Sequence, residues 1–406
     1  MGPGLSPLKP LTAVVAGLLP ILAIAIGLVA APAPSHASVF NPESFTLDNG
    51  MQVVVITNRR VPVVTHMVWY KVGAADEAPG QSGIAHFLEH LMFRGTETIA
   101  DGEFSEMIRR NGGNDNAFTS WDYTAYFQNI AVDRLETVME MEADRMVNLR
   151  LDPDVVEIER GVVLQERSER VDARPGGRLG EQMRAALYRN HPYGTPIIGW
   201  RHEIETLTAE QIKGFYRRWY SPSNAVLVVS GDIDAATLRP LADRIYGALP
   251  AGEDIERRRP IEPDSGAERR LILRDDTVRQ ASWRRTFPAP SYRTATDNTA
   301  YAAQVLSEIL GGSDISRLYR SLVIDQGLVI SAGSGYSPLA YDGATFSLFV
   351  SPPPNPDWDV IESAVMAEIN RLIDEGIPQD ELEDAKKRMA TRAIYARDSL
   401  GGPART

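Results

Sequence analysis

Residues 82 to 95 read Ser-Gly-Ile-Ala-His-Phe-Leu-Glu-His-Leu-Met-Phe-Arg-Gly, and the rest of the chain is organised around this stretch. Ser82 is a favourable N-cap and Gly95 a favourable C-cap, so the stretch predicts one short helix. Apolar side chains recur at helical spacing along one face: Ile84, Phe87, Leu88, Leu91 and Met92. His86, Glu89 and His90 fall on the opposite side, at about 100° per residue. We therefore expect a helix that buries one face and presents these three side chains on the other.

These three side chains form the pattern His-x-x-Glu-His, the inverse of His-Glu-x-x-His and known as the inverzincin motif. Two histidines four residues apart can direct imidazole nitrogens at one metal ion, and a neighbouring carboxylate can take a proton from metal-bound water. The chain has six histidines, and chance would produce the pattern at about the one-in-a-hundred level. We interpret His86 and His90 as metal ligands and Glu89 as the base, rather than as ordinary polar-face residues.

The composition limits the classes of function. A hydrophobic content of 43% and a charged content of 24% over 406 residues are typical of a globular protein with two or three domains. The net charge of −12 argues against a general nucleic-acid binder, and we expect no nucleic-acid partner. The absence of cysteine excludes thiol catalysis, zinc-thiolate sites and disulfides, and it suits an oxidising compartment without proving one.

The first 37 residues predict a signal peptide. Lys9 is the only charged side chain before a nearly unbroken apolar run from Leu11 to Ala31. Small residues at Ser35 and Ala37 follow, as signal peptidase requires, so we expect cleavage after Ala37 and a periplasmic or secreted protein. The apolar run is longer than usual, and an uncleaved anchor is the alternative. A membrane is expected as a partner only in that case.

The chain after the leader predicts alternating strands and helices. Asn49-Gly50 predicts a hairpin turn, and His66 lies within a predicted strand, where we interpret it as structural. The other expected strands are 63–72, 116–130, 225–231, 270–274 and 280–287. The other expected helices are 102–110, 133–148 capped by Asp133, one opened by Asp152-Pro153, 203–220, 235–249, 297–310 and 379–399, with a further start at 311–319.

The helix opened by Asp152-Pro153 carries two acidic residues on one face. Glu159 and Glu166 are seven residues apart. Such pairs are usually solvated surface, but a zinc site with two histidines needs a third protein ligand, commonly a carboxylate. Gly161 costs a helix about 1 kcal/mol relative to alanine. Its presence predicts close packing against a neighbouring element.

Residues 253–267 predict a linker between two domains. They are rich in proline, glycine and mixed charge, and the arginines of Glu256-Arg-Arg-Arg-Pro260 are expected to be solvated. Strand, strand and helix then recur in the order seen before, which indicates an internal duplication. We assign an N-terminal domain to 38–252 and a C-terminal domain to 268–406. The C-terminal domain has no histidine, so it is expected to be inactive, and ordinary domain sizes suggest that about 50 residues are missing from it.

Several separate blocks resemble the pitrilysin-type inverzincin zinc metallopeptidases, most closely the small bacterial members similar to mitochondrial processing peptidase. The resemblance extends from about Phe40 to the end of the chain. The blocks that carry it are His86–Thr96, Asn116-Ala117 with Asp122–Tyr126, Glu159–Glu166, His191-Pro-Tyr-Gly, Tyr220-Ser-Pro-Ser-Asn and Gly231-Asp232.

The resemblance implies both a fold and a set of functional residues. The implied fold is α+β, with two homologous α/β repeats, each an antiparallel sheet packed with helices, and the metal site in the first. The implied activity is that of a zinc endopeptidase acting on peptides or unfolded segments. The implied residues are His86, His90 and Glu166 as ligands of Zn²⁺, Glu89 as the catalytic base, Glu159 as an acid outside the ligand set, and Asn116 and Ala117 as holders of an extended substrate added as a strand.

One departure from the family pattern bears on the partner. The second half of such proteins usually carries an arginine and, seven residues on, a tyrosine, which flank a Gly-Leu pair and bind the substrate. Anchored on Gly327-Leu328, these positions here hold Val323 and Ile330. This implies the zinc-bearing subunit of a heterodimer whose sister chain lacks the zinc motif and supplies the arginine and tyrosine. The alternatives are a self-sufficient homodimer that uses Arg320, and a non-catalytic zinc-binding scaffold.

Overall fold

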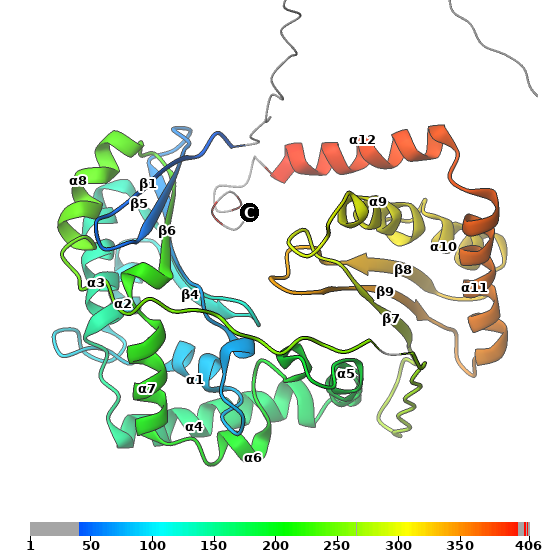
Figure 1. The fold of residues 1–406 in the computed structure, drawn as a ribbon, viewed down its shortest axis with the longest axis horizontal. Helices are drawn as coiled ribbons and strands as arrows, with labels where there is room; N and C mark the ends of the chain where they lie inside the picture. Colours follow the sequence, from blue (N-terminus) through cyan, green and yellow to red (C-terminus); the bar gives the residue numbers. More distant parts are fainter. Residues whose placement is uncertain (1–39, 265, 397–401, 403, 405–406) are drawn as a thin grey trace, which may run out of the picture. The chain divides into compact units, whose positions relative to one another are not determined.

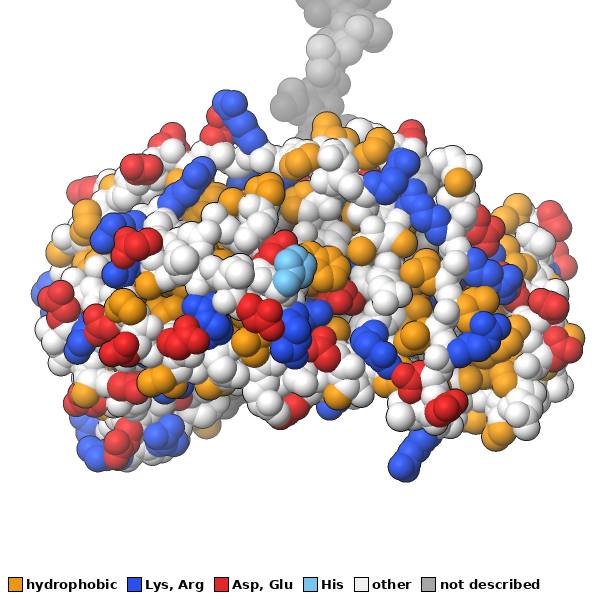
Figure 2. All heavy atoms as spheres, turned by 90° about the horizontal axis from the view of Figure 1, so that it is seen from below, with side chains coloured by type: hydrophobic (Ala, Val, Ile, Leu, Met, Phe, Trp, Pro, Cys, Tyr) orange, Lys and Arg blue, Asp and Glu red, His pale blue; other side chains and the backbone are white. Residues whose placement is uncertain are grey.

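A computed structural model describes residues 40–264 and 266–396, together with 402 and 404. The predicted signal peptide lies outside the described residues. Every helix in the described part of the chain is too short or too polar to cross a bilayer. Figure 2 shows acidic and basic side chains interspersed over one face of the molecule, so that face carries no broad patch of a single sign.

The first half is built on a six-stranded sheet with the strand order β1-β2-β6-β3-β5-β4. All neighbouring strands are antiparallel except β2 and β6, which are parallel. The expected all-antiparallel sheet therefore holds for every pair but one, because β6 enters between β2 and β3 after a long helical excursion. The strands are β1 (Glu43–Thr46), β2 (Gln52–Thr57), β3 (Val63–Tyr70), β4 (Asn114–Thr119), β5 (Thr124–Ala131) and β6 (Ala225–Gly231).

The predicted hairpin at Asn49-Gly50 is confirmed, since β1 pairs with β2 across it and Gly50 has a φ of +86°. The single strand predicted at 116–130 is wrong. It is a hairpin of β4 and β5, whose turn is closed by a hydrogen bond from Ser120 N to Tyr123 O of 2.8 Å. Threonine and aromatic residues continue through the turn, which has no glycine or proline, so β-propensity alone does not reveal the break.

Helices pack on the sheet and around its apolar core (Figure 1). They are α1 (Ile84–Leu91), α2 (Glu103–Arg110), α3 (Leu135–Val147), α4 (Pro153–Arg167), α5 (Pro175–Leu187), α6 (Arg201–Ile204), α7 (Ala209–Trp219) and α8 (Ala235–Ile245). Every second residue of the central strands faces this core, for example Val64 and Val68 of β3 and Leu227 and Val229 of β6. Helix α1 lies against α4 and α7.

Two of the predicted helix boundaries on this sheet are wrong. The helix expected at 203–220 is two helices, because Thr208 and Gln211 form a capping box that starts α7 afresh. The helix expected to be capped by Asp133 begins at Leu135, after a 3₁₀ turn over Val132–Arg134, and no described side chain caps it.

The second half is a three-stranded antiparallel sheet with helices packed on it, in the strand order β7-β9-β8 (Figure 1). Its elements are β7 (Trp283–Ala289), β8 (Ser331–Tyr336), β9 (Ala344–Ser351), α9 (Thr299–Gly311), α10 (Arg317–Tyr319), α11 (Trp358–Glu375) and α12 (Gln379–Ala396). The strand expected at 270–274 is wrong, because no described strand pairs with this segment. Two helix-and-sheet units nonetheless follow one another, as the α+β fold class predicts.

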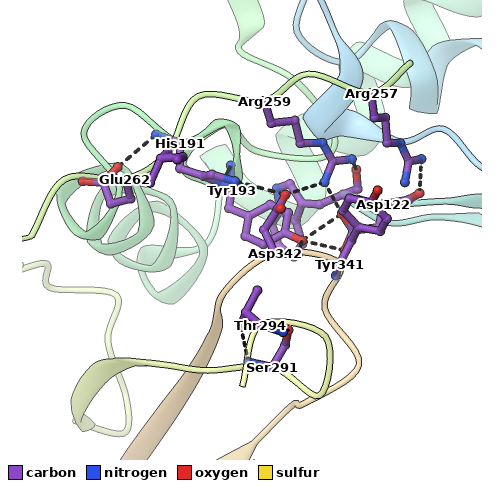
Figure 3. A network of polar contacts seen from close by, with 12 residues as sticks. Asp122, His191, Tyr193, Arg257, Arg259, Glu262, Ser291, Thr294, Tyr341 and Asp342 are labelled. Carbon is purple, nitrogen blue, oxygen red and sulfur yellow. Dashed lines mark hydrogen bonds and ion pairs between the residues drawn. The ribbon is translucent and has the colours of Figure 1, made fainter. Parts of the chain in front are cut away.

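The linker does not run free over the surface (Figure 3). Arg258 is exposed, but Arg259 is 5% exposed and forms ion pairs with Asp76 at 2.9 Å, Asp122 at 2.5 Å and Asp342 at 2.9 Å. Arg257 pairs with Asp76 at 3.1 Å. The predicted solvated run is therefore wrong for two of its three arginines, because their partners come from segments far away in the sequence.

Candidate metal and catalytic site

Helix α1 carries the three side chains of the motif and is shorter than predicted. It begins after Gly83 and ends at Leu91, so neither Ser82 nor Gly95 caps it. The Ser82 hydroxyl instead accepts a hydrogen bond of 2.8 Å from Trp200 N. The predicted apolar face is confirmed, since Ile84, Phe87, Leu88, Leu91 and Met92 are all buried.

The N-terminus of α1 is capped by a carboxylate that the sequence reasoning missed. Glu77 accepts hydrogen bonds of 3.0 Å from both Gly83 N and Ala85 N. These are two of the backbone donors that the first turn of a helix leaves without partners. Glu77 is six residues before Gly83, so no helical or strand period links them, and nothing local in the sequence signals this contact.

The three predicted ligands converge. Nε2 of His86 lies 3.5 Å and Nε2 of His90 lies 3.2 Å from Oε2 of Glu166. The three ligand atoms all fall within 4.8 Å of one another. Oε2 of Glu166 is buried and faces both ring nitrogens. Two imidazole nitrogens and a buried acceptor oxygen that face one another fit a divalent cation such as Zn²⁺.

Helix α4 brings the two acids of the sequence pattern to this point. Glu159 accepts a hydrogen bond of 2.9 Å from Nδ1 of His90 and another of 2.5 Å from Nε of Arg94. With its proton held on Nδ1, His90 can offer the lone pair of Nε2 to a cation bound beside Glu166. Glu159, which orients His90, and Glu166, which faces His90 across the site, are therefore two helical turns apart on α4.

Gly161 does not have the role that its position suggested. A Cβ built on it would meet nothing within 4 Å, so the predicted close packing is wrong. Its neighbours Ile158 and Val162 are exposed by 65% and 42%. Gly161 lies on the outer face of α4. It lowers the stability of the helix there, and no close packing in the described chain offsets this loss.

The electrostatics of the site favour a cation. Burial, reinforced by neighbouring His90, lowers the pKa of His86 to about 4. Burial opposes a charge on His90, but its hydrogen bonds with Glu159 and Glu166 outweigh burial and raise its pKa to about 9. The hydrogen bond from His90 lowers the pKa of Glu166. The carboxylates of Glu159 and Glu166 thus favour a positive charge at this point of the site.

Glu89 lies beside the ligands and is partly buried. Its Oε2 accepts a hydrogen bond of 2.5 Å from the hydroxyl of Thr119, the last residue of β4. Burial raises the pKa of Glu89 above its ordinary value, against the effect of that hydrogen bond. A carboxylate with a raised pKa accepts a proton more readily at neutral pH, which suits the predicted general base.

Asn116 and Ala117 lie on β4, which is the last strand of the sheet and, among the described strands, pairs only with β5. The Ala117 N–H donates to Oδ1 of Asn116 at 2.8 Å. A backbone donor that bonds a side chain rather than β5 points to the open side of β4. This edge could accept an added strand, which is the role predicted for both residues.

His66 is the histidine of β3 that was predicted to be structural, and it is fully buried. Its Nδ1 lies 2.7 Å from Oε1 of Gln128, and its Nε2 lies 2.8 Å from the hydroxyl of Tyr246. Both ring nitrogens therefore have partners in the core, as a structural histidine requires.

Comparison with known protein families decides where the chain belongs. Residues 52–200 match the domain described as Insulinase (Peptidase family M16), and residues 206–389 match the Peptidase M16 inactive domain. The zinc protease PqqE of Helicobacter pylori is 31% identical over 375 residues, which are 91% of this chain and 82% of that protein. The chain belongs to peptidase family M16.

Other members of family M16 resemble the chain over most of its length. The uncharacterized zinc protease YmxG of Bacillus subtilis is 28% identical and covers 87% of this chain and 84% of its own. The crystal structure of a protease from Helicobacter pylori superposes with a TM-score of 0.82 at 32% identity, over 89% of this chain and 87% of that one. The crystal structure of the first half of the periplasmic protease PqqL from Escherichia coli superposes with a TM-score of 0.71 at 25% identity, over 90% of this chain and 79% of that one. These likenesses confirm the predicted family and fold class. Two of the relatives are named zinc proteases, which agrees with the predicted Zn²⁺ cofactor.

The chain has apolar residues at the two positions that the family pattern reserves for arginine and tyrosine. Val323 is half-buried against the core of the second half, and Ile330 is 55% exposed just before β8. Arg320 is exposed and makes no ion pair or side-chain hydrogen bond with the described residues. It is therefore available for other contacts.

Proposed function

We propose that this M16 peptidase is a zinc-dependent endopeptidase that hydrolyses peptides or unfolded protein segments. One observation carries the proposal, namely that His86, His90 and Glu166 converge beside the partly buried Glu89. The zinc proteases among its relatives support it. A non-catalytic zinc-binding scaffold would have no need of a base in that position.

The proposed mechanism assigns each residue one task. His86, His90 and Glu166 would hold Zn²⁺ which, when bound, supplies a Lewis acid that acidifies water and polarises a carbonyl. Glu89 takes a proton from the attacking water and delivers it to the leaving amine. Glu159 keeps His90 in its binding orientation through Nδ1.

The substrate is proposed to bind to the free edge of β4. An extended peptide would add a strand there, with Asn116 and Ala117 among its contacts. The Asn116 side chain would have to release the Ala117 N–H, which is then free to pair with the peptide backbone. Main-chain pairing of this kind accepts many sequences, which suits an endopeptidase for unfolded segments.

Substitution of Glu89 tests the activity. Glu89→Gln keeps the shape but cannot accept a proton, so we expect a loss of about 10²- to 10⁴-fold in kcat with the zinc content unchanged. Glu97→Gln, at an exposed site nearby, is the matched control. Turnover of an unstructured peptide and elemental analysis of the same samples provide the measurement. A wild type without zinc, or full activity in Glu89→Gln, would contradict the proposal.

We further propose that the enzyme is exported, with cleavage after Ala37. The mature protein would comprise the domain at 38–252, the linker at 253–267 and the domain at 268–406. The apolar leader supports this, and one relative is described as a periplasmic protease. N-terminal sequencing of the exported protein tests it, and a chain that still begins at Met1 in the membrane fraction would favour the anchor instead.

The absence of a donor at Val323 and Ile330 supports a third proposal. The chain would act as the zinc-bearing subunit of a heterodimer, with the missing arginine and tyrosine supplied by a sister chain. The free Arg320 supports the competing homodimer. Substitution of Arg320 separates these two assemblies, because only the homodimer would depend on its guanidinium.

A further inference from the structure

Thr119 contacts the proposed base from outside the motif. Its hydroxyl donates to Oε2 of Glu89 at 2.5 Å, although the two residues are 30 positions apart. Within the described part of the chain, this is the hydrogen bond that the Glu89 carboxylate makes. Oε1 of Glu89 remains free to accept a proton from water.

The position of the Thr119 hydroxyl is fixed by the sheet. Thr119 pairs with Thr124 at the end of the β4–β5 hairpin. The next residue, Ser120, donates to Tyr123 O at 2.8 Å and accepts from Ala74 N at 3.0 Å. Threonine is β-branched and therefore has few χ1 rotamers. A donor that is held on both sides can fix the rotation of the Glu89 carboxylate.

The same strand provides the free edge on which a substrate is proposed to bind. The Ala117 N–H lies on this edge, two residues before Thr119. The peptide and the base would thus be positioned by a single strand, and any displacement of β4 would move both together. This alignment matters because a misplacement of about 1 Å can cost about a hundredfold in rate.

We propose that Thr119 is a positioning residue, which holds the Glu89 carboxylate in register with a peptide bound along β4. The inference rests on the proposed function and adds to it a residue that the motif does not contain. No covalent step is assigned to the threonine. It donates one hydrogen bond to Oε2 and leaves Oε1 for the proton of the attacking water.

The test compares two substitutions in the full chain, under conditions in which the wild type turns over an unstructured peptide. Thr119→Val keeps the shape but removes the hydroxyl, and we expect kcat to fall about ten- to a hundredfold. KM, zinc content and melting temperature should remain near those of the wild type. Thr119→Ser keeps a hydroxyl and should recover most of kcat. Thr65→Val, which removes a threonine hydroxyl bonded to Asn129 at 2.7 Å on a neighbouring strand, is the matched control.

A double-mutant cycle separates positioning from a structural role. If Thr119 acts through Glu89, Thr119→Val should cause no further loss of kcat in the Glu89→Gln background. An additive loss, an equal loss in Thr119→Ser, or a fall in zinc content would show that Thr119 only supports the fold, and would overturn the inference. Undiminished kcat in Thr119→Val would overturn it as well, with the proposed function intact. A wild type that does not depend on Glu89 would remove the proposed function itself.

Discussion

Glu159 illustrates how one buried side chain can control a site that it does not enter. It is 3% exposed, and its two oxygens are bonded to His90 and Arg94. The bond to His90 fixes a proposed ligand whose free orientation would otherwise cost entropy when a metal binds. Through its hydrogen bond with His90, the carboxylate of Glu159 connects α4 to α1.

Substitution of Glu159 should therefore weaken metal binding without removing a ligand. We expect Glu159→Gln to lower zinc affinity by about 10- to 100-fold, because a neutral amide oxygen accepts the Nδ1 proton of His90 more weakly than a carboxylate and makes the ring a poorer ligand. Competition with a chromogenic chelator measures this directly. Glu157→Gln lies on the exposed side of the same helix and should leave the affinity unchanged. Equal affinities in wild type and Glu159→Gln would contradict the orienting role.

At the scale of elements, the packing of glycines around α1 and α4 shows where a glycine can be replaced by a residue with a side chain. Gly83 and Gly199 both have a φ of +86°, and their backbones cross at the start of α1. A Cβ on Gly199 would lie 2.5 Å from Ser82 O. Gly161 on α4 has open space around it instead. Equivalent substitutions at these sites should have opposite effects.

We expect Gly161→Ala to stabilise the protein by about 0.5–1 kcal/mol, since alanine favours the helix and meets no atom. Gly199→Ala should destabilise by more than about 1 kcal/mol, because it combines a strained φ with a backbone clash. Urea unfolding of both variants, with the zinc content recorded, measures the two effects. Stabilisation by Gly199→Ala would show that the crossing of the two loops is not as close as described.

The elements also show why sequence reasoning reached part of the site. His86, Glu89 and His90 were predictable because one helix sets their spacing. Glu166 could be identified only from a family block, since 75 positions separate it from His90 and no local period spans them. Glu77 and Thr119 were missed because each reaches α1 from a different loop or strand. Chemistry repeated along one element can be read from the sequence, whereas contacts between elements depend on tertiary packing.

At the scale of the whole molecule, Arg259 joins segments that the sequence places far apart. Asp76 and Asp122 come from the first half, and Asp342 comes from the loop between β8 and β9 (Figure 3). Asp122 is three residues beyond Thr119, so this cluster also adjoins the hairpin that bears the proposed substrate strand. The linker contributes a fixed charge here rather than a flexible connection.

Removal of that charge should be costly. Arg259→Met would leave Asp122 and Asp342 without their shared arginine and Asp76 with Arg257 alone, and we expect a loss of about 3–5 kcal/mol in the free energy of unfolding. Arg258→Met, at an exposed neighbour 81% accessible, should change stability by less than about 0.5 kcal/mol. Urea denaturation of the two variants measures the contrast. Similar urea midpoints of unfolding for the two variants would show that the ion pairs of Arg259 contribute little to the stability of the fold.

Acid should weaken the same contact. Burial favours the neutral form of Asp342, but hydrogen bonds with His191 and Arg259 hold its pKa at about 2, below its ordinary 3.8. A depressed pKa stabilises the fold above the ordinary value, and that contribution is lost as pH falls through about 2. The stability difference between wild type and Asp342→Asn should therefore be constant near neutral pH and narrow from about pH 4 to pH 2. A difference that widens in acid would contradict this assignment.

The rate of peptide cleavage should depend on the assembly. A peptide in this site needs a donor for its oxyanion beyond the metal, and loss of one such donor typically costs about 10²- to 10³-fold in kcat. Val323 and Ile330 offer none, so the purified chain should bind zinc but cleave an unstructured peptide slowly. Addition of a family member that lacks His-x-x-Glu-His but keeps the arginine and tyrosine should restore turnover. Val323→Arg with Ile330→Tyr should restore part of it without the sister chain. Full-speed cleavage by the chain alone would contradict the heterodimer, and its loss in Arg320→Ala would identify Arg320 as the donor of a homodimer.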